Sequence, residues 1–166
     1  MTDEVVNETG QTTEPETGNG TGTETSTDES TSTSVINLAI EAVAALINEM
    51  NLFATISRGA LGTGNSLCCE PVPSTVETVF MDKEYYLPLT LAINGKHDNL
   101  QTLSDALNNI LDTLSMSKTY PSGTGWEIVD ITAGGEPRVI GREENNAWLM
   151  NADVIMKIYR KDEADT

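Results

Sequence analysis

Residues 87–114 read "LPLTLAINGKHDNLQTLSDALNNILDTL" and join a strand pattern directly to a helix pattern. Apolar residues occupy every second position over 87–93, which is typical of a strand with one buried face. Leucine and isoleucine then recur three or four positions apart, which predicts an amphipathic helix over about 99–116. Asp98 is the expected N-cap, and Gln101 stands at the reciprocal position of a capping box. This unit predicts a helix packed on one face of a sheet.

Further strand patterns lie on both sides of this unit. Residues 75–81 and 84–94 are expected to form a hairpin, and alternating runs predict strands at 126–133 and 148–160. Pro88 cannot donate a hydrogen bond to a neighbouring strand, so we expect its strand to lie at a sheet edge or to be bulged there.

A second helix is predicted over about 35–50, with Ser34 as its N-cap. It is apolar on two sides, and the second apolar stripe comprises Leu38, Ala42, Ala45 and Leu46. One side is expected to pack on the sheet, and the other on a neighbouring element of the chain or on another subunit. The order of elements predicts an α+β fold: an antiparallel sheet of about four to five strands with two helices packed on one face.

Composition divides the chain into three parts. Residues 1–34 carry eight acidic and no basic residues and almost no aliphatic side chains, so we expect a disordered acidic arm. Residues 35–161 form the predicted folded domain, and residues 162–166 are an acidic tail. The whole chain has 26 acidic and 9 basic residues, a net charge of −17. This balance argues against binding to nucleic-acid phosphates or to an anionic membrane.

The compartment expected from the sequence is a reducing cytosol. The first residues lack the basic and apolar regions of a secretory signal, and the apolar segment 35–47 is too short to span a bilayer. Cys68 and Cys69 are adjacent, without the spacing of redox or zinc motifs, and are predicted to pack as small apolar side chains.

No residue set typical of an enzyme is recognisable in the sequence. The glycine-rich loop 59–64 lacks the Gly-Lys-Ser/Thr ending of a phosphate-binding loop. His97 is the single histidine, and no serine or cysteine nucleophile pairs with it in a recognisable pattern, so a structural or exposed position is expected. Glu143 and Glu144 lack the alternation of a calcium loop. We therefore expect a protein that is not an enzyme and that holds no cofactor or metal.

The long polar connection 134–147 contains two arginines, Arg138 and Arg142, in an otherwise acidic protein. A guanidinium suits bidentate contact with a carboxylate of a partner protein. The alternative is local ion pairing with Glu136, Glu143 or Glu144.

Residues 35–161 resemble the minor capsid or tail terminator (tail completion) proteins of long-tailed bacteriophages. The similarity follows three stretches in order: VINLAIEAVAALINEM, then LPLTLAINGKHDN with LQTLSDALNNILDTL, then PRVIGREENNAWLMNADVIMKIYRK. The last stretch supplies the candidate assembly contacts Pro137, Arg138, Gly141, Arg142, Glu143 and Trp148.

The resemblance implies a virion structural protein at the head–tail junction, made in the host cytoplasm. Such a subunit forms a ring, commonly a hexamer, on the last layer of tail-tube protein, stops tube growth and offers a surface to the head connector. The genome passes through the ring without specific binding, and no membrane is involved. Two alternatives stay open: another neck or tail component, such as a head-closure or tube protein, and a non-catalytic cytosolic binding module.

Overall fold

The computed structural model describes residues 29–72, 78–80 and 84–160. Residues 1–28 of the arm predicted to be disordered, and the acidic tail 162–166, lie outside this range. The elements are α1 (Glu29–Asn48), β1 (Ile56–Arg58), β2 (Ser66–Val72), β3 (Thr78–Val79), β4 (Tyr85–His97), α2 (Leu100–Met116), β5 (Ser122–Gly123), β6 (Trp126–Ala133), β7 (Arg138–Arg142) and β8 (Trp148–Arg160). The strands β6 and β8 have the bounds that the sequence predicted.

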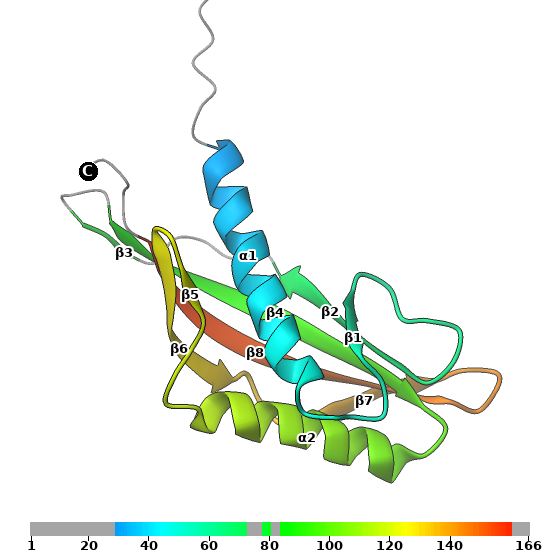
Figure 1. Cartoon of the computed structure of the whole chain (residues 1–166). Helices are drawn as coiled ribbons and strands as arrows, with labels where there is room; N and C mark the ends of the chain where they lie inside the picture. Colours follow the sequence, from blue (N-terminus) through cyan, green and yellow to red (C-terminus); the bar gives the residue numbers. More distant parts are fainter. Residues whose placement is uncertain (1–28, 73–77, 81–83, 161–166) are drawn as a thin grey trace, which may run out of the picture.

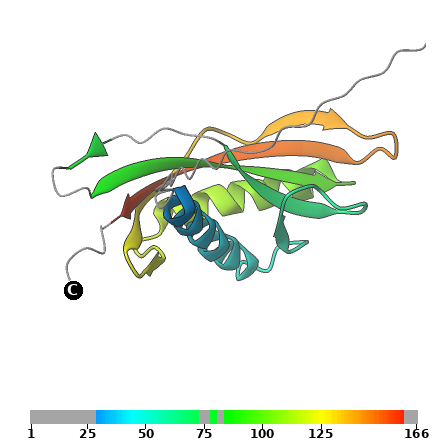
Figure 2. The same cartoon turned by 90° about the horizontal axis from the view of Figure 1, so that it is seen from above.

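All the described strands belong to one sheet. Its order is β1-β2-β4-β8-β6-β5, with β3 beside β4 and β7 beside β8. Both helices lie on the same face of this curved sheet (Figures 1 and 2). The α+β class is confirmed. The predicted sheet of four to five antiparallel strands is wrong, because the sheet has eight strands and β1 runs parallel to β2.

The centre of the sheet is the long antiparallel pair of β4 and β8. Their register runs from Tyr85 opposite Arg160 to His97 opposite Trp148. The prediction that the strand of Pro88 lies at an edge is wrong, since β4 has neighbours on both sides. On the side away from β8, Pro88 lies between the stretch paired with β3 and the stretch paired with β2.

The core lies between the helical layer and the inner face of the sheet. The stripe of α2 predicted from the sequence is buried, as are alternate residues of β4 and β8. The largest completely enclosed side chains include Ile40, Leu91, Leu107, Ile110 and Met156. Replacing one of these with alanine would cost about 2–5 kcal/mol, because both transfer energy and packing are lost.

Both predicted helix starts need correction. The helix α1 begins at Glu29, so Ser34 lies inside it and the ordered domain begins before residue 35. Residues 29–34 contain no glycine or proline, so nothing in them interrupts a helix that the following apolar turns stabilise. The N-cap of α2 is Asn99 rather than Asp98: the Asn99 side chain accepts a hydrogen bond from Thr102 N–H at 3.1 Å. Asparagine and aspartate are equally good caps, so the sequence did not distinguish them.

Candidate assembly surfaces

The connection predicted as a long loop is an ordered hairpin. Its first part is the strand β7, paired with the first residues of β8. The turn is closed by hydrogen bonds from Glu143 N–H to Ala147 O and from Asn146 N–H to Glu143 O, each 2.9 Å. Asn146 adopts a left-handed conformation, with φ of 70°, which asparagine tolerates better than most residues. The candidate contacts therefore have fixed positions on a strand and a tight turn.

Both arginines of this hairpin contact residues of their own chain. Arg138 forms an ion pair with Asp153 at 3.3 Å, and 68% of its side chain is still exposed. The Arg142 guanidinium lies 4.6 Å from the ring centroid of Trp148, and its Nε donates to Asn146 O at 3.0 Å. Neither arginine has the glutamate partners that local ion pairing predicted. Because most of the Arg138 side chain is exposed, its guanidinium can still contact a carboxylate of a partner protein.

Glu143 is half-buried and forms an ion pair within its own chain. Its two carboxylate oxygens lie 3.2 and 3.3 Å from Nζ of Lys96, whose side chain is only 5% exposed. Lys96 Nζ also donates to Thr63 O at 3.4 Å. One buried ammonium thus holds the β7–β8 turn and the glycine-rich loop against the end of β4. Of the six candidate contacts, Glu143 is the one that the structure places in an internal ion pair.

The strand β7 exposes two neighbouring apolar side chains that the sequence analysis did not select. Val139 is 49% exposed and Ile140 is 56% exposed. The register shifts between Val139 and Gly141, a bulge that leaves both branched side chains accessible. Pro137 is half-buried just before the strand. The sequence feature that could have identified this exposed patch is an aliphatic pair between two arginines, inside an otherwise polar segment.

The outer side of α1 is partly covered by its own chain. Ala42 and Leu46 are half-buried and pack against the core, whereas Leu38 is 46% exposed and Ala45 is exposed. Arg58 of β1 reaches this side of the helix and donates to Asn37 Oδ1 at 2.9 Å. Of the four predicted subunit-facing positions, two remain available to another molecule.

The face of the sheet opposite the helices carries an aromatic cluster. The rings of Tyr86 and Tyr159 lie 5.2 Å apart, and Lys157 Nζ lies 4.5 Å from the Tyr86 ring centroid. Phe80 contacts Tyr86 edge to face, and the Tyr159 hydroxyl donates to the Glu84 carboxylate. These contacts join side chains of β4 and β8, so the cluster stabilises the β4–β8 pair on the face away from the helices.

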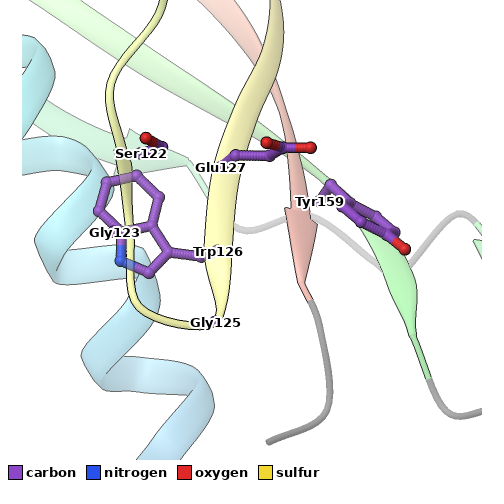
Figure 3. A pocket seen from close by; sticks show the side chains of 6 residues that line it. All are labelled: Ser122, Gly123, Gly125, Trp126, Glu127 and Tyr159. Atoms are coloured by element: carbon purple, nitrogen blue, oxygen red, sulfur yellow. The ribbon is translucent and has the colours of Figure 1, made fainter.

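A shallow hollow of about 240 Å³ lies beside the β5–β6 hairpin (Figure 3). Its lining residues are Ser122, Gly123, Gly125, Trp126, Glu127 and Tyr159. Figure 3 shows the Trp126 ring against the β5 backbone at Gly123, where an added Cβ would lie 2.5 Å from Trp126 Nε1. The hollow is open to solvent, and the titratable groups that line it are Glu127 and Tyr159.

The histidine and the cysteines have structural positions. Asn99 N–H donates to Nδ1 of His97 at 2.8 Å, and the His97 ring contacts Phe53 edge to face. Cys68 and Cys69 are buried, and burial raises the pKa of both thiols. Among the described residues, no group of three or more histidine, cysteine, aspartate or glutamate side chains is placed to hold a metal ion.

Neither described helix is long and apolar enough to cross a membrane. No protein-family model and no curated protein matches the chain.

Proposed function

We propose that the chain is a virion structural protein, a tail terminator that forms a ring at the head–tail junction of a long-tailed phage. The observation that carries the proposal is that two different surfaces expose apolar side chains: Leu38 and Ala45 on α1, and Val139 and Ile140 on β7. A ring of identical subunits needs two unlike, complementary surfaces on each subunit, whereas a two-fold dimer needs one.

The positions of these surfaces favour a ring. The strands β1 and β7 belong to opposite sides of the central β4–β8 pair, and α1 contacts β1 through Arg58. Figure 2 shows β7 and α1 on opposite sides of the long strands. A contact between α1 of one subunit and β7 of the next would leave a free surface at each end of a pair, so subunits add until the ring closes.

The net charge of −17 suits a ring through which a genome passes. Acidic walls form no phosphate contacts that release counterions, so they do not retain the nucleic acid. The tail-tube protein and the head connector are the further partners in this proposal.

The location is tested by antibody labelling of purified particles of the phage that encodes the chain, viewed by negative-stain electron microscopy. Label at the junction of head and tail is the expected result. Absence from purified particles would contradict a structural role, and label along the whole tube would favour a tube protein.

The two surfaces are tested by Leu38→Asp and Ile140→Asp, with Met116→Asp as the matched control. Met116 is 77% exposed at the end of α2, away from both surfaces. Each single variant is expected to prevent ring formation on tail tubes. A mixture of the two is expected to give pairs but no rings, because one intact contact remains between unlike variants. Rings in either single variant, or loss of rings in the control, would refute the assignment of these surfaces.

A further inference from the structure

The strand β7 is an open edge of the sheet. Within the residues that the structure describes, it pairs only with β8. Figure 2 shows β7 at the margin of the sheet, next to β8. An edge strand presents backbone N–H and C=O groups that an extended segment can bind.

The side chains of this edge define what would bind there. The order along β7 is basic, apolar, apolar, glycine, basic: Arg138, Val139, Ile140, Gly141 and Arg142. The two aliphatic side chains are about half exposed, and the Arg138 side chain is 68% exposed. Opposite charges and branched side chains on neighbouring strands stabilise their pairing. The matching partner is an extended segment with two aliphatic residues between acidic ones.

The chain itself contains such a segment outside the described residues. Residues 4–8 read Glu-Val-Val-Asn-Glu, and Val5 and Val6 are the aliphatic residues of the acidic arm apart from Met1. Aligned with β7 in either direction, the two glutamates fall opposite the two arginines. We propose that residues 4–8 add to the free edge of β7 in the same chain as a further strand.

The connection is long enough for this arrangement. Twenty residues, 9–28, separate the segment from the start of α1. They reach at most roughly 66 Å when extended. The longest strands of the sheet have thirteen residues and span about 43 Å. Residues 4–8 can therefore reach β7 from the first turn of α1.

The same chain, rather than a second copy, is the favoured source of the segment. A tether of this length gives the segment an effective concentration on the order of millimolar. Free protein at micromolar concentration offers far less of the same segment from other molecules. The inference concerns the isolated subunit and does not depend on the proposed tail function.

Disulfide trapping tests the proximity directly. The variant Val6→Cys with Ile140→Cys is expected to form an intramolecular disulfide in the full chain, at a rate independent of protein concentration. The control is Thr13→Cys with Ile140→Cys. Position 13 is joined to α1 by a shorter tether than position 6 is, but it lies outside residues 4–8. Cys68 and Cys69 compete poorly, because both are buried and burial raises the pKa of their thiols. Equal trapping in both variants, or trapping between two copies, would overturn the proposal.

Hydrogen exchange tests the pairing without new cysteines. Val5→Asp with Val6→Asp is expected to speed exchange of β7 amides by about tenfold, because the added strand is lost. Thr12→Asp with Thr13→Asp adds the same charge to the arm and should exchange as the unmodified chain does.

Charge reversal tests the two arginines. Either Glu4→Arg with Glu8→Arg, or Arg138→Glu with Arg142→Glu, is expected to speed exchange of β7 amides, and combining all four is expected to restore slow exchange. Circular dichroism checks that the arginine variants are folded. Slow exchange in the single-sided variants, or no restoration in the combined one, would overturn the pairing.

Discussion

The internal ion pair of Lys96 and Glu143 gives the sharpest test of how the β7–β8 hairpin is held. The change Glu143→Gln removes the negative charge and keeps nearly the same shape. The Lys96 ammonium would then stay inside the fold with Thr63 O, at 3.4 Å, as its remaining oxygen partner from the protein apart from the new amide. If Glu143 instead serves mainly as a contact to another molecule, the change should hardly lower the free energy of unfolding of the isolated domain.

The expected cost follows from the unequal exposure of the two partners. Removing one member of a fully buried pair costs about 3–5 kcal/mol, whereas an exposed pair contributes about 0–1 kcal/mol. The Lys96 side chain is 5% exposed and that of Glu143 is 36% exposed. Solvent reaches the carboxylate but not the ammonium, and glutamine keeps one acceptor oxygen. We expect Glu143→Gln to lower the free energy of unfolding by about 2 kcal/mol, which lowers Tm by roughly 7 °C for a domain of this size.

Urea unfolding followed by tryptophan fluorescence measures this change, with Lys96→Met together with Glu143→Gln as the control. The double variant buries no charge, so its free energy of unfolding should return to within about 1 kcal/mol of the unmodified protein. A loss below about 0.5 kcal/mol in Glu143→Gln, or no recovery in the double variant, would refute the reasoning.

Three further predictions concern stability. Asn99→Ala should lower the free energy of unfolding by about 1 kcal/mol through loss of the α2 cap, whereas Asp98→Ala should change it by less than about 0.5 kcal/mol; thermal melts of both variants compare them. Gly123→Ala should cost about 1–3 kcal/mol, because its Cβ would meet Trp126 Nε1 at 2.5 Å, whereas Gly64→Ala, with no atom within 4 Å, should cost little. Burial raises the pKa of the thiols of Cys68 and Cys69 above that of an exposed cysteine. Their contribution to the free energy of unfolding is therefore complete below the unfolded-state pKa, about 8.5, and is lost as the pH rises through the folded-state pKa. Urea midpoints measured from about pH 8 to about pH 10.5 should therefore fall less steeply when both cysteines are alanine, and parallel curves would contradict this.

The long elements were predictable because each carries its own periodicity. The strands β6 and β8 and the buried stripe of α2 follow alternation or helical spacing over eight or more residues. The pattern fixed which side chains face inward. It did not fix the helix starts, since Ser34, Asp98 and Asn99 are all acceptable caps by residue type.

The short strands β1, β5 and β7 could not be predicted, because their hydrogen-bond partners lie elsewhere in the chain. β1 has three residues and β5 has two, too few for a recognisable period. β7 has five, with glycine and arginine in place of alternation. The burial of Lys96 could not be predicted either, since its ion-pair partner Glu143 is 47 residues away in the sequence. The sequence identified the hairpin as a place of interest, but not which of its residues face outward.

The two proposals make competing demands on β7, and this competition has a physical consequence. One edge can pair with residues 4–8 of its own chain or contact α1 of a neighbouring subunit, but not both. A neighbour must therefore bind tightly enough to displace a tethered segment, and the apparent affinity between free subunits falls by the fraction of chains whose edge is occupied. In the proposed ring, subunits held side by side on a tail tube would have a raised local concentration and would meet this requirement first. An acidic arm that occupies β7 would thus restrict ring closure to subunits on the tube while leaving the free subunit monomeric.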